Sequence, residues 1–426
     1  MSTFGAAITP VYYMNRIIGQ APYSRNNNVY RPNRWAAIYT VLLMFSYWMT
    51  FGTAVQRSIE DTDGDLTIKT STTYLQISIG CATQTVCWLC AIFQQNLITN
   101  CYNLMILVDE KLKKIAPDAK YQSTVKQMLI QQIVVWGIGI GSCALVNIIS
   151  ILNGYFTAGV NWLTYYGPLS GLWAFVSLYT NFTNALRKRY KVINEKMEEF
   201  NKPRRICRQK IDFLSSNIIQ VRPITKTVYL PETKIATPLK GMKVNKVSAI
   251  ENHVQMIDSS VLQIMGEIHH NLCEISKKIM HALGIQSLVT IAFIFVTTTC
   301  QMFYLLVLTE SKGALSSTCS TIWLLLYVLP LIVLCGTCHM CASEANDTGN
   351  ILHSIKNYGS YDDNFRTTAT LLSLQFIHHE INFTACGFFN IDFTLLQAIL
   401  GAVTTYLVIL LQFSAGLSKK AEHDHE

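Results

Sequence analysis

The chain has 426 residues, of which 50% are hydrophobic and only 14% are charged, and its mean hydropathy is +0.27. Soluble chains of this length rarely have such a composition, so it excludes an ordinary soluble domain and predicts a membrane protein. The formal net charge is +8. Its excess lies almost wholly in segments expected to face the cytosol, which argues against a nucleic-acid partner.

Seven apolar stretches are long enough to cross a bilayer. A hydrocarbon core of about 30 Å needs about 20 helical residues, because each residue rises about 1.5 Å. None of the seven has an Asp, Glu, Lys or Arg in its interior. The sequence therefore predicts an all-α membrane protein with seven transmembrane helices. They run from Ala36 to Gln56, Tyr74 to Ile98, Met128 to Leu152, Trp162 to Leu186, Leu283 to Leu308, Thr321 to Ala342 and Phe393 to Leu417.

The distribution of Lys and Arg predicts the direction of these helices, because cytoplasmic loops retain positive charge. Residues 1–35, 99–127, 187–282 and 343–392 together hold 29 basic residues, and the alternate segments hold 5. The N-terminus is therefore expected in the cytosol and the C-terminus outside. Residues 1–35 carry four arginines and no apolar core of the kind found in a cleaved signal peptide.

The connecting segments complete the predicted organisation. Four prolines between residues 202 and 246 predict a disordered insertion. Residues 247–282 carry an apolar stripe at spacings of three and four, which predicts a long helix continuing into the fifth span. The expected parts are a cytosolic arm (1–35), helices 1–4 (36–186), a long cytosolic segment (187–282), helices 5 and 6 (283–342), a cytosolic loop with a helix before the pore (343–392), helix 7 (393–417) and an extracellular tail (418–426).

The last span ends in the string Thr405-Tyr406-Leu407-Val408-Ile409-Leu410-Leu411-Gln412-Phe413. Residues seven apart nearly eclipse one another in a helix, so Thr405 and Gln412 form a polar stripe beside an aromatic stripe of Tyr406 and Phe413. Polar side chains in hydrocarbon are costly unless they face water or protein. This helix is therefore expected to line a water-filled path or to contact a partner helix.

The same string resembles the Thr-Tyr, five hydrophobics, Gln-Phe signature of insect gustatory receptors at every position. The run from Phe383 to Phe393 resembles the family's sequence before the last helix, while the first two thirds of the chain are similar only in layout. The resemblance implies a tetrameric, ligand-gated, non-selective cation channel of chemosensory neurons, related in fold to insect odorant receptors. It also implies plasma-membrane localisation and assembly as a homotetramer or with related receptors.

The resemblance assigns roles to residues of the last helix. Gln412 and Phe413 would form the extracellular gate, and Thr405, Val408 and Ile409 would lie on or beside the pore. Phe413 would exclude water from the closed pore. The alternative is that Thr405 and Gln412 only bond between helices.

The resemblance also implies a tastant pocket in the outer half of the helix bundle. Aromatic and amide side chains in the outer halves of these spans suit either a sugar or a flat plant metabolite. Bitter or plant secondary compounds are the favoured ligands, and a fructose-gated or other sugar-gated channel is the alternative. Such aromatic residues also occur as membrane-interface belts. The candidates are Asn147, Tyr165, Tyr166, Gln301, Tyr304, Trp323 and Tyr327.

Two other classes compete with the channel. A G-protein-coupled receptor needs the N-terminus outside, which the charge distribution opposes. A transporter or intramembrane enzyme usually has carboxylates in its spans, and these spans have none. The sequence thus predicts no catalytic residues and no cofactor. It also predicts no metal site, because the Cys and His side chains of Cys335–Cys341 point around one helix. The expected partners are a small-molecule tastant and membrane lipid.

Overall fold

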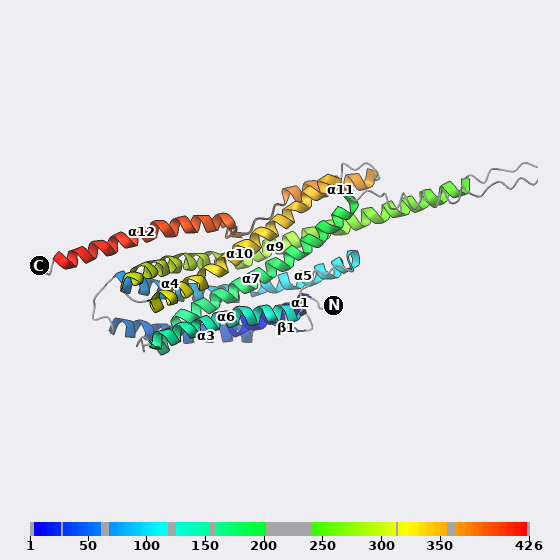
Figure 1. The fold of residues 1–426 in the computed structure, drawn as a ribbon. Helices are drawn as coiled ribbons and strands as arrows, with labels where there is room; N and C mark the ends of the chain where they lie inside the picture. The colour runs from blue at the N-terminus through cyan, green and yellow to red at the C-terminus, as the bar shows by residue number, and fades with distance from the viewer. Residues whose placement is uncertain are drawn as a thin grey trace, which may run out of the picture. The chain divides into compact units, whose positions relative to one another are not determined.

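The computed structural model describes residues 4–26, 29–60, 68–117, 125–152, 158–201, 241–311, 314–355 and 363–423. Nearly all of them are helical (Figure 1). Of the segment 202–246 that was predicted to be disordered, residues 202–240 lie outside the described residues, and residues 241–246 are helical. The elements are α1 (Phe4–Ala7), α2 (Thr9–Ile17), β1 (Tyr23–Asn26), β2 (Val29–Pro32), α3 (Arg34–Glu60), α4 (Ile68–Phe93), α5 (Gln95–Ile115), α6 (Val125–Leu152), α7 (Ala158–Asn201), α9 (Gly241–Ser311), α10 (Ala314–Ile355), α11 (Asp363–His378), β3 (Thr384–Ala385), β4 (Phe389–Asn390) and α12 (Phe393–His423).

The chain divides into two compact units, and α7, α9 and α10 contribute residues to both. Unit 1 comprises Met1–Tyr190, His270–Ala345 and Ile381–Glu426. Unit 2 comprises Lys191–His269 and Asn346–Glu380.

Unit 2 is a helical bundle built from the ends of α7, α9 and α10 together with α11. The ring of the buried His269 lies 3.9 Å from that of Phe376, measured between centroids. Gly266 lets α9 approach α11 closely, because a Cβ there would lie 2.6 Å from a methyl carbon of Leu372. Thr348 donates a buried 2.7 Å hydrogen bond to Asn194.

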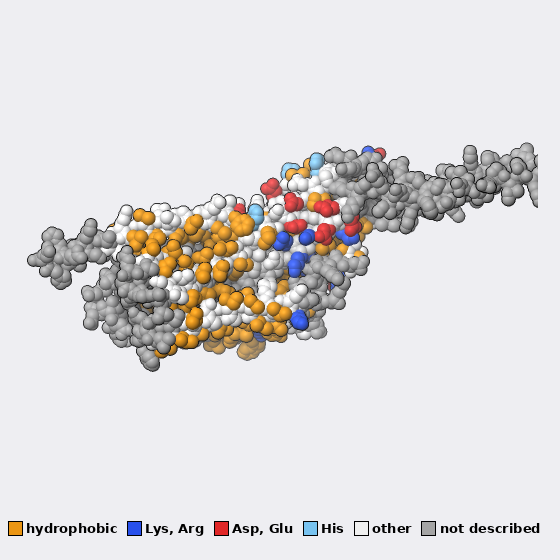
Figure 2. Space-filling model, in the orientation of Figure 1, with side chains coloured by type: hydrophobic (Ala, Val, Ile, Leu, Met, Phe, Trp, Pro, Cys, Tyr) orange, Lys and Arg blue, Asp and Glu red, His pale blue; other side chains and the backbone are white. Residues whose placement is uncertain are grey.

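Six helices contain a stretch long and apolar enough to cross a membrane, as found among the described residues. Figure 2 shows hydrophobic side chains spread over the displayed face of unit 1, as expected of a surface in contact with lipid. The candidate spans are Arg34–Gln56 in α3, Ser71–Phe93 in α4, Lys126–Ile148 in α6, Phe393–Ser414 in α12, and parts of Ser260–Leu306 in α9 and of Ser317–Ser354 in α10.

The remaining predicted span, 162–186, lies in α7, where no described stretch is equally apolar. The reason is a set of polar residues that α7 turns toward the protein. Ser177, Asn181 and Thr183 are buried. Gln132 of α6 donates a 3.0 Å hydrogen bond to the Ser177 hydroxyl, and Asn181 donates to the Ser177 carbonyl. A central helix can carry such residues because its neighbours, rather than lipid, satisfy them.

Residues 4–32, expected only as a cytosolic arm, form two helices and the antiparallel β1–β2 hairpin. Of these elements, α1 and β2 pack on α5, and α2 packs on α6. The rings of Tyr30 and Tyr102 stack at 4.4 Å, and that of Tyr23 lies 5.8 Å from Tyr102. Asn103 accepts a hydrogen bond from the backbone N–H of Tyr30 and donates one to its carbonyl. Because buried aromatic contacts of this kind stabilise a core, this segment is an integral part of unit 1.

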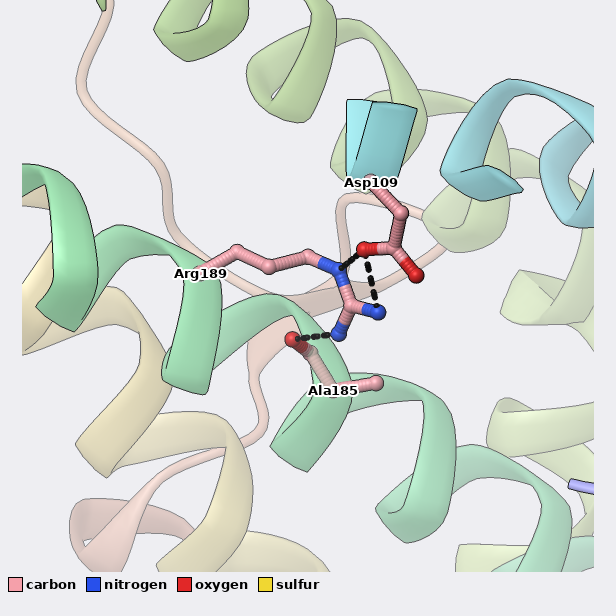
Figure 3. Close-up of polar contacts among 3 residues, drawn as sticks. All are labelled: Asp109, Ala185 and Arg189. Carbon is pink, nitrogen blue, oxygen red and sulfur yellow. Dashed lines mark hydrogen bonds and ion pairs between the residues drawn. The ribbon is translucent and has the colours of Figure 1, made fainter. Parts of the chain in front are cut away.

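A buried ion pair joins α5 to α7 (Figure 3). Nε of Arg189 donates a 2.8 Å hydrogen bond to Asp109, and a second guanidinium nitrogen lies 2.7 Å from the same carboxylate oxygen. A third donates to the Ala185 carbonyl at 2.6 Å. Burial raises the pKa of the Asp109 carboxyl, and the guanidinium opposes that rise.

Candidate functional site

A cavity of about 210 Å³ lies within unit 1 between α4, α7, α9 and α10. Gly80 allows α7 and α9 to approach α4 closely, because a Cβ at this position would lie 3.1 Å from Pro168 of α7 and 3.3 Å from Phe293 of α9. The cavity is lined by Thr73, Gln76, Gly80, Tyr165, Pro168, Phe293, Thr297, Gln301, Tyr304, Trp323 and Tyr327.

Five of the eleven residues that line the cavity are aromatic. Trp323 and Tyr327 of α10 stack at 6.0 Å with 17° between their planes. The ring of Phe293 meets Tyr327 edge-on at 5.6 Å, and Tyr165 lies 6.3 Å from Trp323. Such flat faces suit an aromatic or otherwise planar guest.

The polar groups of the wall are neutral amides and hydroxyls. Gln76 donates a 3.4 Å hydrogen bond to the carbonyl of Thr297. The Tyr304 hydroxyl lies 2.7 Å and 2.8 Å from the hydroxyls of Thr72 and Thr73, so it joins α9 to α4. Among the described residues, no lining side chain is an Asp, Glu, Lys, Arg or His. A charged guest would have to leave water without a counter-charge, which is costly.

Five of the seven ligand residues predicted from the sequence line this cavity: Tyr165, Gln301, Tyr304, Trp323 and Tyr327. The other two lie behind its wall. Tyr166 stacks on Trp323 at 5.3 Å, and Asn147 donates a 2.8 Å hydrogen bond to the Tyr166 hydroxyl. The structure brings all seven together, and whether they bind a ligand stays a prediction.

Sequence reasoning missed the contribution of α4 to this cavity. The available signal was a glutamine and a glycine, Gln76 and Gly80, four residues apart in the second predicted span. On a helix, that spacing places both residues on one face.

The predicted pore residues lie on the exposed face of α12. Thr405, Val408 and Ile409 line an open groove together with Thr404, Gly401, Leu400 and Gln397. The hydroxyls of Thr404 and Thr405 donate to carbonyls four residues earlier in the same helix. Gln412 and Phe413 lie one turn beyond the groove and are exposed, Phe413 by 66%.

The groove and these two residues form a continuous strip of mixed polarity on α12, which we call the α12 strip. Tyr406 differs from them, because its ring meets Phe295 of α9 at 5.8 Å. It therefore contacts the helix bundle as well as the exposed side.

The start of α12 is held by a side-chain cap and a tight turn. Asp392 accepts hydrogen bonds from the backbone N–H of Thr394 at 2.8 Å and from its hydroxyl at 2.6 Å. This is the geometry of an N-cap, and the bond from the hydroxyl lowers the pKa of Asp392. In the β3–β4 turn Cys386 and Gly387 both have positive φ, 51° and 78°. Phe388 closes the turn by donating to the Ala385 carbonyl.

The arrangement of helices, cavity and strip defines a helical membrane protein with an internal cavity, and comparison with known proteins identifies its family. The 7tm chemosensory receptor family model matches residues 8–415, so the chain belongs to the 7tm chemosensory receptor family.

Two curated relatives from Drosophila melanogaster are similar over part of the chain. Gustatory receptor 68a is 34% identical over 217 residues, which are 45% of this chain and 54% of that receptor. Gustatory receptor for bitter taste 66a is 26% identical over 182 residues, 38% of this chain and 32% of that receptor. The chain thus spans about half the length of the first relative and a third of the second.

Among solved structures, the insect olfactory receptor OR5 from Machilis hrabei has a similar fold. The TM-score is 0.62 with 12% sequence identity, over 95% of this chain and 97% of that receptor. At this identity the likeness shows the fold alone. The expected membership of the insect gustatory and chemosensory receptors and the expected relation in fold to odorant receptors are confirmed.

Proposed function

We propose that this protein is a taste receptor that is itself a cation channel, opened by a small tastant bound in the α4–α7–α9–α10 cavity. The α12 strip is the observation that carries the proposal. A lipid-facing helix has no reason to present Thr405 and Gln412. Several copies placing this strip around one axis would enclose a water-filled path.

The same proposal includes a tetramer with the N-terminus in the cytosol of chemosensory neurons. In this assembly Gln412 and Phe413 act as the gate. The 66% exposure of Phe413 in a single copy supports this role, because an apolar ring in a narrow pore excludes water until the helices separate.

The walls of the cavity favour a neutral, planar plant compound over a sugar. A cavity of about 150 Å³ can hold benzene, so a volume of about 210 Å³ accommodates one substituted ring. A sugar would bury many hydroxyls, and each unpaired hydroxyl weakens binding. The relative named for bitter taste agrees with this choice. Fructose is the alternative ligand.

The gate is tested by current recordings from cells that express Phe413→Ala. Removing the ring should raise the current that flows without tastant, because water and ions then enter the closed pore. Phe93→Ala, at the end of α4 and 76% exposed, makes the same change outside the α12 strip and should leave that current unchanged. A Phe413→Ala channel that is as silent at rest as the parent would contradict the gate.

The cavity is tested with Trp323→Ala, which removes the ring that stacks on both Tyr166 and Tyr327. A screen of uncharged phenolic compounds beside fructose should first identify an agonist of the parent channel. In Trp323→Ala, losing the stacked ring should raise the half-maximal concentration of that agonist by about fivefold, since one aromatic contact contributes roughly 1 kcal/mol. A response only to fructose would favour the sugar-receptor alternative.

A further inference from the structure

The C-terminal end of α2 lies among spanning helices. Three successive backbone carbonyls there accept side-chain hydrogen bonds. The carbonyl of Ile17 accepts a hydrogen bond from the hydroxyl of Tyr39 at 2.8 Å. The carbonyl of Ile18 accepts one from the indole N–H of Trp88 at 2.8 Å, and the carbonyl of Gly19 accepts one from the hydroxyl of Thr40 at 2.9 Å. Side chains of α3 and α4 thus satisfy carbonyls that the end of a helix leaves unpaired.

These bonds fix the depth of α2. Tyr39 and Thr40 lie five and six residues beyond Arg34, where the candidate span of α3 begins. That distance is about 8 Å along the helix. Gln20 reaches further inward and donates a 3.0 Å hydrogen bond to the carbonyl of Gly171 in α7. Non-helical backbone at membrane depth needs such partners, so the end of α2 enters the bundle at the level of the α3 span.

One face of α2 stays uncovered at this depth. Val11, Tyr12 and Asn15 are buried against unit 1, whereas Tyr13 and Ile17, one turn apart, are 57% and 65% exposed. Trp35 is 80% exposed at the start of α3, and the exposed residues Ile38 and Leu42 continue the apolar surface along α3. Because α3 faces lipid there, the α2 face adjoining it faces lipid as well.

Arginines lie beside this apolar face. Arg31 at the end of β2 and Arg34 at the start of α3 are exposed, and neither forms an ion pair among the described residues. Asn33 between them caps α3 by accepting from the N–H of Trp35 at 2.9 Å. The cap holds both arginines close to the point where α3 begins.

We propose that Tyr13, Ile17 and Trp35, with Arg31 and Arg34, form a binding surface for anionic phospholipid of the inner leaflet. The three apolar side chains enter the acyl boundary, and the two guanidinium groups bind headgroup phosphates. The amphipathic face of α2, its fixed depth and the neighbouring cations all favour lipid as the occupant. Naming the inner leaflet depends on the proposed cytosolic N-terminus, whereas binding itself does not.

The headgroup contact is tested with the full chain in nanodiscs of phosphatidylcholine, with and without phosphatidylserine. Phosphatidylserine should raise the unfolding temperature of the parent protein, because a ligand that binds the folded state stabilises it. The double variant Arg31→Gln/Arg34→Gln should lose most of this rise. Lys113→Gln/Lys114→Gln removes the same charge from exposed positions at the end of α5 and should keep it.

Two results would overturn the headgroup contact. One is an unchanged phosphatidylserine effect in Arg31→Gln/Arg34→Gln, and the other is an equal loss in both double variants, which would mark a general effect of charge. Neither result bears on the channel, because nanodiscs report no current and present the same lipids on both faces. Failure of the proposed lipid surface and failure of the proposed function are therefore separable.

The embedded face is tested with Ile17→Trp in nanodiscs that contain brominated phosphatidylcholine. Bromine quenches nearby indoles, so the emission gained over the parent should be strongly quenched. Lys191→Trp, at a site whose side chain is 59% exposed in unit 2, should give added emission that bromine leaves intact. Equal quenching of the two added indoles, or none at position 17, would contradict the embedded face of α2.

Discussion

At the scale of single residues, the buried ion pair between Asp109 and Arg189 is a contact of unit 1 in which each partner requires the other. Their side chains are only 3% and 2% exposed, so each charge depends on the other for its stabilisation. Removing one partner of such a pair leaves an uncompensated buried charge.

We expect Arg189→Met to lower the free energy of unfolding by about 3–5 kcal/mol, measured by thermal unfolding of the purified protein in detergent. The loss should grow as the pH rises above about 4, because a lone buried Asp109 binds its proton more tightly in the folded than in the unfolded state. Lys191→Ala removes an exposed pair with Glu195 on the same helix and should cost only about 0.3 kcal/mol. Similar losses in both variants would show that the Asp109 pair is not structural.

Gly171 is a second residue whose identity the packing demands. A Cβ there would lie 1.8 Å from the amide oxygen of Gln84 and 3.1 Å from the amide nitrogen of Gln20, and both glutamines are buried. We expect Gly171→Ala to destabilise the protein by about 1–3 kcal/mol, in the same unfolding measurement.

Gly139→Ala is the matched control for this change, because no atom lies within 4 Å of a Cβ at that position in α6. Alanine favours helix over glycine, so this variant should be neutral or slightly more stable. If the two alanine variants unfold at the same temperature, the contact among Gln20, Gln84 and Gly171 is not close-packed in solution.

At the scale of elements, sequence patterns predicted the apolar helices well. Charge-free stretches of about 20 residues mark α3, α4, α6 and α12, because lipid contact demands apolar side chains. The signal weakens in α7, where buried Ser177, Asn181 and Thr183 lower the hydropathy of a helix surrounded by protein. Hydropathy reports contact with lipid, so it says little about a central helix.

The N-terminal segment and the cavity depend on contacts between distant parts of the chain, which local sequence patterns do not predict. Docking of residues 4–32 depends on contacts such as Tyr30 with Tyr102, which are far apart in the sequence. Aromatic and amide side chains in the outer halves of the spans pointed to five residues of the cavity wall, whereas the part played by Gln76 and Gly80 required knowing which face of α4 meets α7 and α9.

The cap of α12 gives a prediction at this scale. We expect Asp392→Ala to lose the two hydrogen bonds from Thr394 and to lower the free energy of unfolding by about 1 kcal/mol, with a smaller tastant-evoked current. Asp392→Asn retains a side-chain acceptor and should behave much like the parent. If Asp392→Asn is impaired as strongly as Asp392→Ala, the charge of Asp392 matters rather than the cap.

At the scale of the whole molecule, the proposed channel brings the α12 strips of several copies together around a shared pore. The exposed groove from Gln397 to Ile409 and the exposed side chains of Gln412 and Phe413 would otherwise face lipid. A shared pore has a consequence for mixtures of subunits, because each subunit contributes one residue to every ring.

We expect Gln412→Arg subunits to suppress the current of parent subunits expressed in equal amounts. One arginine in the ring repels cations, and random mixing leaves roughly one-sixteenth of tetramers free of the variant. Gln412→Asn, which keeps an amide, should leave most of the current in the same mixture. A remaining current near one half would mean that each subunit conducts by itself.

The cap and the β3–β4 turn fix the N-terminal end of α12. A Cβ at Gly284 of α9 would lie 3.1 Å from the sulfur of Cys386, so the turn rests closely on its neighbour. From Phe393 to Phe413 the helix is about 30 Å long. A tilt of roughly 5° about its base would carry the far tip sideways by nearly 3 Å, on the order of a water molecule's diameter. Leverage of this kind would let a guest no larger than one substituted ring control ion flow without large rearrangement of the bundle.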